Sequence, residues 1–316
     1  MSEAPLHRRD LLRAAALAAA ALALRAPLAS CSGGGASGVR SGGGPDQERL
    51  ARWSESLRAE RLMPPDGQLG RAAARVGELA ADTPYEAHTL ETYIRDGGDP
   101  EVEPLTLSLT RFDCVTLVEA CLAVARASAS EGTASWEAFG REVERMRYRG
   151  GLRRGYASRL HYFSEWIADG ERRGLVKDLG RKLGGVEDPR PLRFMTSHRD
   201  SYPALADDAV LSEIAEIERG LDGRPRYVVP TSRIPAVAEE VETGDVLAFA
   251  TTIPGLDVTH AAFAYRDDTR TLRVLHAPLS GGVVEITSTT LPEYVAAIRR
   301  SSGILVARPG WAPLSR

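Results

Sequence analysis

Cys114 is the residue whose type and position could perform chemistry most directly. It lies in the segment RFDCVT (111–116), at the start of an apolar run that predicts a buried helix. Asp113 is a natural N-cap, and a cysteine in the first helical turn feels the positive end of the helix dipole, which favours the nucleophilic thiolate. A free cysteine is more often a structural core residue, so this position alone leaves both interpretations open. Cys121, two helical turns later among apolar residues, is interpreted as core packing.

Two histidines in the second half of the chain could complete a nucleophilic site. A cysteine nucleophile needs a base and a group that orients the base. His260 lies in VTHAAFAY (258–265) and His276 in LRVLHA (272–277), and each could instead be a core histidine satisfied by hydrogen bonds. If the two runs pair through the turn at 267–270, the rings are neighbours, and one can fix the tautomer of the other. A cysteine followed by a histidine on a later sheet is the arrangement of papain-like hydrolases.

Composition and missing motifs exclude several other classes of protein. The chain has 316 residues, 43% of them hydrophobic, and a net charge of −3, so it is neither wholly disordered nor basic enough to indicate a nucleic-acid partner. The sequence has no HExxH motif, no CxxC pair and no GxSxG elbow. We therefore expect no metal, no other cofactor and no serine nucleophile. The sequence does not indicate the oligomeric state.

The first 45 residues have the pattern of an export signal and a tether. Residues 1–30 combine a basic start, an Ala/Leu core and a small-residue end, as a signal peptide does. The pair Arg8-Arg9 resembles a twin-arginine signal, and LASC resembles a lipobox in which Cys31 receives lipid. An ordinary cleaved signal is the alternative. Residues 31–45 are rich in Gly and Ser, which predicts a flexible tether. We expect an exported lipoprotein at the periplasmic face of the outer membrane, with membrane contact only through its lipid.

The remaining chain, 46–316, is expected to form a single catalytic domain that positions these groups. Its hydrophobic patterns predict mostly helices first and a meandering antiparallel sheet second, which is typical of an α+β fold. The predicted helices are two within 46–81, separated by a PPDG turn, and then 114–127, 135–149, 158–173, 208–220 and 291–300. The predicted strands are 105–109, 246–251, 258–265, 272–277, 283–287 and 303–308, and residues 185–205 are expected to form an irregular loop.

An ordered set of short segments resembles the N-acetylmuramoyl-L-alanine amidase-like family, a branch of the NlpC superfamily of papain-like cysteine hydrolases. The matching segments are Pro84-Tyr85, Thr89-Leu90-Glu91, Phe112 to Glu119, Ser158 to Phe163, Phe194 to His198, Gly244-Asp245-Val246, Gly255 to His260 and His276-Ala277. The resemblance implies a papain-like NlpC-type fold, in which N-terminal helices, including the nucleophile helix, pack on a C-terminal antiparallel sheet. Two departures are Leu117, where the family has Phe, and Pro278, where a small polar residue is expected.

The resemblance also implies the roles of the candidate residues. Cys114 is the expected nucleophile, His260 the base and His276 the orienting residue. The expected reaction is hydrolysis of the bond between N-acetylmuramic acid and L-alanine in peptidoglycan fragments (anhydro-muropeptides), through a thioester.

Three further residues are candidates for binding the substrate. Arg159, His161 and Tyr162 could line the cleft, since a guanidinium suits a peptide carboxylate and a tyrosine suits a sugar face, although Arg159 could equally lie on a solvated helix face. Two other functions stay open. One is a D,L-endopeptidase that cuts within the stem peptide, with Asp113 reading a free amine, and the other is a non-catalytic cell-wall-binding lipoprotein.

Overall fold

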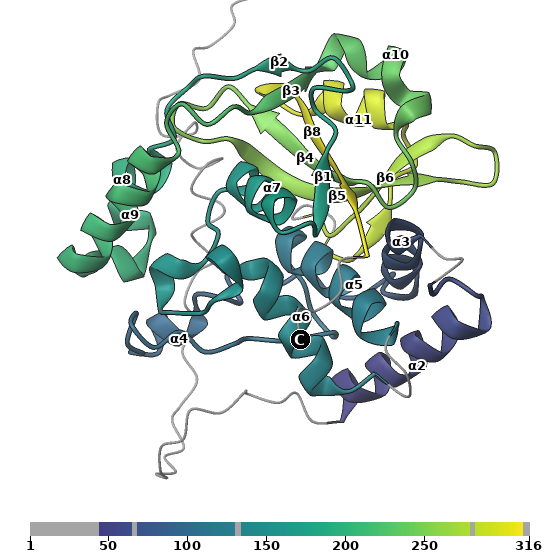
Figure 1. Cartoon of the computed structure of the whole chain (residues 1–316), viewed down its shortest axis with the longest axis horizontal. Coiled ribbons are helices and arrows are strands. Elements are labelled where there is room, and N and C mark those ends of the chain that lie inside the picture. The colour runs from purple at the N-terminus through teal and green to yellow at the C-terminus, as the bar shows by residue number, and fades with distance from the viewer. Residues whose placement is uncertain (1–43, 65–67, 130–133, 279–281, 312–316) are drawn as a thin grey trace, which may run out of the picture.

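The computed structural model describes residues 44–64, 68–129, 134–278 and 282–311 (Figure 1). The predicted signal peptide, the lipobox with Cys31 and nearly all of the tether lie outside these residues. Within the described ranges, none of the helices combines the length and the apolar character needed to cross a membrane.

Helices make up most of the first half of the described chain. They are α2 (Pro45–Ala59), α3 (Leu69–Leu79), the short α4 (Thr92–Arg95), α5 (Cys114–Ser128), α6 (Trp136–Arg147) and α7 (Phe163–Arg172). Residues 117–128 of α5 are all buried, because α2, α3, α6 and strand β5 surround this helix. Its nearly all-apolar sequence is what a helix enclosed on every side requires.

The second half contributes an antiparallel sheet. Its strands are β1 (Val176–Asp178), β2 (Val186–Glu187), β3 (Tyr227–Pro230), β4 (Val246–Thr251), β5 (Val258–Arg266), β6 (Leu272–His276), β7 (Glu285–Ile286) and β8 (Ser301–Pro309). The order is β2-β3-β8-β4-β5-β6-β7, and β1 also pairs with β8. Strands β4 to β7 follow the predicted meander, whereas β8 departs from it by lying between β3 and β4.

The two faces of this sheet bury different cores because side chains alternate along each strand. On β4, Val246, Ala248 and Ala250 belong to the core shared with α2, α3, α5 and α6. Leu247 and Phe249 belong to the opposite core, which includes residues of α10 (Ile234–Val237) and α11 (Leu291–Ala297). Figure 1 shows α2, α3, α5 and α6 on one side of the sheet and α10 and α11 on the other. The predicted mixed α+β architecture is therefore confirmed.

A third, smaller core lies under α8 (Phe194–Ser197) and α9 (Asp208–Gly220). The turn at Gly255 joins this core to the start of β5, since its carbonyl accepts the backbone N–H groups of Arg193 and Phe194, both at 3.0 Å. Gly255 has φ of +77°, a conformation that glycine adopts without steric cost.

Three of the predicted elements differ from the structure. Residues 185–205 are expected to form an irregular loop, but they contain β2 and α8. The segment 105–109 is extended but joins no sheet, because its three leucines are buried against helices instead; a Cβ on Gly140 of α6 would lie only 3.2 Å from Leu107 Cδ1. The helix predicted from residue 158 begins only at Phe163. Its N-terminus is capped by a distant residue, since Asp257 Oδ2 accepts the backbone N–H of Ser164 at 2.8 Å.

Candidate active site

Cys114 is the first residue of α5, and its position is set by the residues on either side. Asp113 Oδ1 accepts the backbone N–H of Thr116 at 2.7 Å, and the Thr116 hydroxyl accepts the backbone N–H of Asp113 at 2.9 Å. This reciprocal capping box defines where the helix begins, so the predicted N-cap role of Asp113 is confirmed. Cys114 is half-buried, and Cys121 is fully buried in the core as predicted.

The resting thiol of Cys114 is neutral. Burial, aided by the negative charge of Asp113, raises its pKa to about 12, although the backbone N–H groups of Ala261, Val115 and Cys114 itself act in the opposite direction. As predicted, these N–H groups lower the pKa of the thiol and so favour the thiolate. Burial raises the pKa by more, so the predicted net preference for the thiolate is wrong. For this sulfur to act as a nucleophile, its proton would have to be removed.

His260 and His276 form a hydrogen-bonded pair on neighbouring strands. Phe263 of β5 faces Leu275 of β6, so the same register places His276 opposite Ala262 and diagonal to His260, on one face of the sheet. His260 Nε2 lies 2.8 Å from His276 Nδ1, which confirms the predicted neighbourhood of the rings. Since Nε2 of His260 contacts His276, the other nitrogen of His260, Nδ1, is the atom that is left to accept a proton from a thiol.

Aromatic neighbours hold both rings in place. Phe249 of β4 stacks on His260 with 5.7 Å between centroids and 9° between planes. The Tyr294 hydroxyl of α11 lies 3.3 Å from His276 Nδ1. Burial, aided by repulsion from His276, lowers the pKa of His260 to about 3, and burial lowers the pKa of His276 to about 4. Both rings are therefore neutral at physiological pH and can accept a proton.

Shared neighbours place the three predicted catalytic residues in the same corner of the fold. Ala261, the neighbour of His260 in the chain, places its backbone N–H near the Cys114 sulfur. A negative charge on Cys114 raises the pKa of Tyr294, which itself contacts His276. The start of α5 therefore lies near β5, β6 and α11, which follow Cys114 by more than 140 residues in the sequence.

Sequence reasoning assigned no role to three residues of this corner. Tyr85 borders the nucleophile, since a charge on Cys114 also raises its pKa, and Tyr294 touches His276. Glu285 lies directly opposite His276 in the β6–β7 pairing, with 3.7 Å between Glu285 Oε1 and His276 Nε2. Glu285 is the charged residue of the otherwise apolar run VVEIT, and this could have suggested a special role for it. Nothing in the sequence indicated that Tyr294 would approach the histidines.

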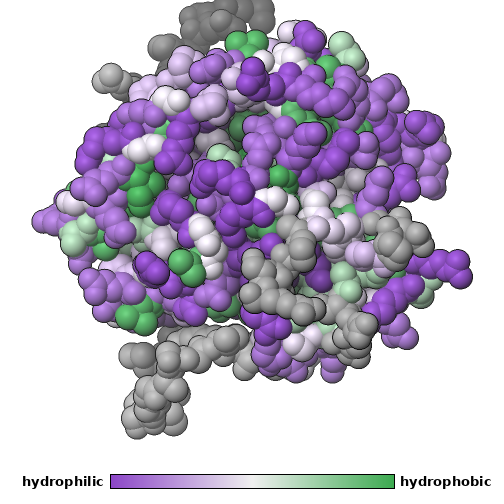
Figure 2. Space-filling view, viewed as in Figure 1, coloured by the Kyte–Doolittle hydropathy of each residue, from purple (hydrophilic) through white to green (hydrophobic). Residues whose placement is uncertain are grey.

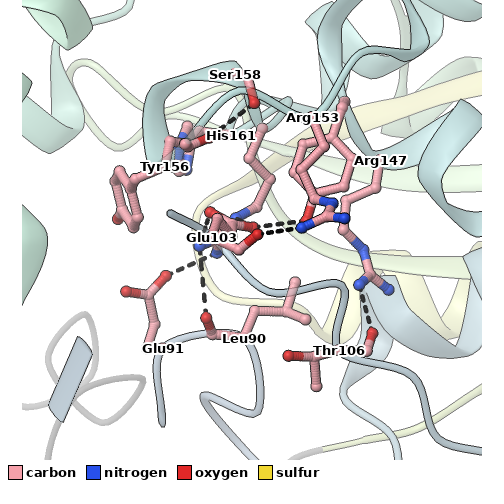
Figure 3. A network of polar contacts seen from close by, with 12 residues as sticks. Leu90, Glu91, Glu103, Thr106, Arg147, Arg153, Tyr156, Ser158 and His161 are labelled. Atoms are coloured by element: carbon pink, nitrogen blue, oxygen red, sulfur yellow. Dashed lines mark hydrogen bonds and ion pairs between the residues drawn. The ribbon is translucent and has the colours of Figure 1, made fainter. Parts of the chain in front are cut away.

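The predicted cleft residues have partners inside the protein. Arg159 is buried; its Nε and Nη2 donate to Glu103, both at 3.0 Å, and its Nη1 donates to Glu91 at 2.7 Å. His161 Nε2 lies 2.9 Å from the carbonyl of Tyr156, and the Tyr162 hydroxyl donates to Glu218 at 2.6 Å. Figure 3 shows Glu103 at the centre of this polar network, with Glu91 and His161 around it. Substrate binding by Arg159, His161 and Tyr162 stays a prediction that these internal contacts do not favour.

The surface around the fold is largely polar. Figure 2 shows a predominantly hydrophilic face on which apolar residues are scattered. Among the described residues, no group of three or more His, Cys, Asp or Glu side chains is arranged to hold a metal ion. The groups available in the described corner are thus a thiol, two imidazoles, the Glu285 carboxylate, the hydroxyls of Tyr85 and Tyr294, and backbone N–H donors.

Comparison with known proteins relates this arrangement to a family. A model of the N-acetylmuramoyl-L-alanine amidase-like family matches residues 75–304. An N-acetylmuramoyl-L-alanine amidase of known structure from Bacteroides uniformis is 31% identical, with a TM-score of 0.70 and coverage of 77% of this chain and 100% of that one. A Bacteroides fragilis protein, provisionally named a xylanase, is 32% identical with a TM-score of 0.67, covering 74% and 99% of the two chains.

A Legionella pneumophila protein shares the fold alone, at 17% identity and a TM-score of 0.61, over 83% of this chain and 94% of that one. The search of curated proteins found no match. The family model covers most of the chain, and the B. uniformis enzyme aligns over its full length with the same mixed helix and antiparallel-sheet architecture. The chain therefore belongs to the N-acetylmuramoyl-L-alanine amidase-like family.

Proposed function

We propose that this protein is a cysteine amidase that hydrolyses the bond between N-acetylmuramic acid and L-alanine in peptidoglycan fragments. The observation that carries the proposal is the arrangement of one thiol at a helix N-terminus beside a hydrogen-bonded histidine pair, 2.8 Å apart, on the sheet. The same arrangement supports membership of the NlpC superfamily with its papain-like fold. Family membership and the amidase name of the B. uniformis relative support the reaction and the substrate class.

In the first step of this mechanism, the Cys114 sulfur attacks the lactyl carbonyl carbon of the muramoyl group. The thiol proton passes to His260 as the S–C bond forms, because the shifted pKa values of both groups leave them neutral at rest. The backbone N–H groups around the start of α5 stabilise the negative oxygen that develops. His260 then gives its proton to the L-alanine nitrogen as the C–N bond breaks, which leaves a thioester and a free peptide.

In the second step, His260 removes a proton from water, which attacks the thioester carbon. The S–C bond breaks, the sulfur recovers its proton and the muramoyl carboxylate leaves. His276 accepts a hydrogen bond from His260 Nε2 in both steps, which keeps the Nδ1 lone pair directed away from the pair and available for proton transfer.

Two other activities are less well supported by the contacts around Cys114. An endopeptidase reading a free amine would need a carboxylate there, and Asp113 Oδ1 is engaged in capping α5. A glycosidase, as the name of the B. fragilis relative suggests for that protein, generally requires two carboxyl groups flanking the scissile bond. A cell-wall-binding lipoprotein without activity would have no need for the paired imidazoles.

The test of this function is product analysis by mass spectrometry. The full chain, purified in detergent, is incubated with a disaccharide-anhydro-tetrapeptide, beside Cys114→Ala and the matched control Cys121→Ala. We expect free disaccharide and intact tetrapeptide from the wild type and from Cys121→Ala, and no products from Cys114→Ala. Cleavage within the peptide would establish the endopeptidase instead, and binding without cleavage would establish the binding protein.

We also propose export as a lipoprotein anchored through Cys31 at the periplasmic face of the outer membrane. The lipobox-like LASC segment and the Gly/Ser-rich residues that follow support this proposal. Incorporation of an alkyne-labelled fatty acid into the wild type but not into Cys31→Ala, with the label in the outer-membrane fraction, is the expected result. Equal labelling of both proteins would refute it.

A further inference from the structure

Glu285 occupies a position that the proposed mechanism has not used. It lies on the edge strand β7, directly opposite His276 in the pairing with β6. His276 is only 1% exposed, and its Nε2 atom is buried without a hydrogen-bond partner at normal distance among the described residues. Glu285 Oε1 is 3.7 Å from this atom, close enough for a direct contact after a small side-chain movement or for one bridging water.

The other contacts of His276 determine which of its nitrogens carries the proton. Its Nδ1 atom is approached by His260 Nε2 at 2.8 Å and by the Tyr294 hydroxyl at 3.3 Å. Both neighbours can donate a hydrogen bond, and the carboxylate of Glu285 on the other side of the ring can only accept one, so an unprotonated Nδ1 suits all three groups. The proton of neutral His276 then belongs on Nε2, the atom that faces the carboxylate of Glu285. With this tautomer, His260 carries its own proton on Nε2 and keeps Nδ1 free to accept one.

We propose that Glu285 is a positioning residue of the active site: it holds His276 in the Nε2–H tautomer and stabilises the positive charge that arises when His260 takes the thiol proton. The chain of groups thus runs from Cys114 through His260 and His276 to Glu285. The catalytic part of this inference rests on the amidase function proposed above. The tautomer of His276 and the reactivity of Cys114 do not depend on it.

The groups around the pair come from three elements and one loop. Cys114 and Asp113 belong to the start of α5, Tyr294 to α11, Glu285 to β7 and Tyr85 to the loop after α3. Glu285 faces the buried Nε2 atom of His276, whereas Asp113 lies next to Cys114 at the other end of this chain of groups. Because the Glu285 side chain is 46% exposed, water screens its charge, so we expect an effect of about threefold to tenfold rather than the complete loss that follows removal of a nucleophile.

Two measurements test this role with variants of the full chain. The first is the rate at which iodoacetamide alkylates Cys114, followed by mass spectrometry of the Cys114 peptide from pH 5 to 10. The second is the separation of kcat from KM for the muropeptide. The variants are Glu285→Ala, Glu285→Gln, which keeps an acceptor oxygen, and the control Glu86→Gln. Glu86 is a similarly exposed carboxylate, and it lies beside Arg111 and Phe112 near the start of α5.

For Glu285→Ala we expect alkylation at pH 7 and kcat to fall about threefold to tenfold, with the pH–alkylation profile displaced to higher pH and KM unchanged. Glu285→Gln should lie between Glu285→Ala and the wild type, and Glu86→Gln should match the wild type in alkylation. Equal alkylation rates and profiles in all four proteins would overturn the proposal. If Glu285→Ala does not fold, the comparison of Glu285→Gln with Glu86→Gln makes the same test.

Nitrogen-15 spectra of the histidine rings give a readout that hydrolysis does not affect. We expect the Nε2–H tautomer for His276 in the wild type at pH 7, and a mixture of tautomers in Glu285→Ala. The Nδ1–H tautomer in the wild type would refute the role of Glu285. An inactive wild type with the expected tautomer and alkylation rates would refute the amidase function while leaving the positioning role intact.

Discussion

Replacing His276 by glutamine should change how the stability of the protein depends on pH. His276 is a buried neutral ring, and burial lowers its pKa from 6.5 to about 4. An unfolded chain protonates this histidine near pH 6.5, whereas the folded protein does so only near pH 4. The unfolded state therefore binds more protons between these values. The stability that the neutral ring contributes is complete above pH 6.5 and is lost as the pH falls towards 4.

The size of the effect follows from the same two pKa values. A pKa difference of one corresponds to about 1.4 kcal/mol, so the whole contribution of His276 is about 3 kcal/mol, of which about 2 kcal/mol disappears between pH 7.5 and pH 5.0. The assay is urea unfolding of the wild type and His276→Gln at both pH values. We expect the wild type to lose about 2 kcal/mol more than the variant on acidification, because groups away from the pair titrate equally in both proteins and burial, the main cause of the low pKa of His260, remains in the variant.

An equal loss of stability in the two proteins would refute this reasoning. It would mean that the folded protein already carries the proton on His276 at pH 5, as it would if the ring formed an ion pair with Glu285 across the 3.7 Å between them. A neutral His276 is also the basis of the proton path described above, so the measurement tests the electrostatics of the site without a substrate.

Three further predictions concern the site and its supports. Because burial lowers the pKa of His260 to about 3 and that of His276 to about 4, kcat/KM should stay level from pH 8 down to about 5.5 and fall only below about pH 4; a fall centred near 6.5 would contradict this. Glu103→Ala leaves a buried guanidinium without its main partner and should lower the free energy of unfolding in urea by about 3–5 kcal/mol. Gly244 has φ of +88°, and a Cβ at this position would overlap the Gly70 carbonyl. Gly223 also has a positive φ, but a Cβ there would meet no other atom, so Gly223→Ala should cost only about 1 kcal/mol. Thermal denaturation should therefore show Gly244→Ala to be far less stable than Gly223→Ala.

Local patterns made the centre of the site predictable from the sequence. Asp113 and Cys114 stand at the junction between an extended segment and an apolar run, where a cap and a helix start are expected. His260 and His276 belong to runs joined by a tight turn, and neighbouring strands joined in this way usually pair. Each of these inferences needed only residues that are close together in the chain.

The groups that the prediction missed or placed differently depend on long-range contacts. Arg159 meets Glu103 across 56 residues and Glu91 across 68, so no helical spacing could show that its guanidinium is paired internally. Tyr294 reaches His276 from a helix that packs on the sheet face opposite α5. The net pKa of Cys114 depends on how deeply the fold buries it, which a sequence pattern does not reveal.

The position of the last strand has a consequence for the order in which the protein can assemble. β8 pairs with β1, β3 and β4, so until residues 301–309 are synthesised β4 has an unpaired edge, and β1 and the β2–β3 pair are separate from strands β4 to β7. Contacts over such separations form slowly during folding. A nascent chain can already hold α5 and the strands β5 and β6, yet the sheet that carries them is completed only when β8 pairs with β4. Until β8 is in place, the open edge of β4 can therefore pair with another chain.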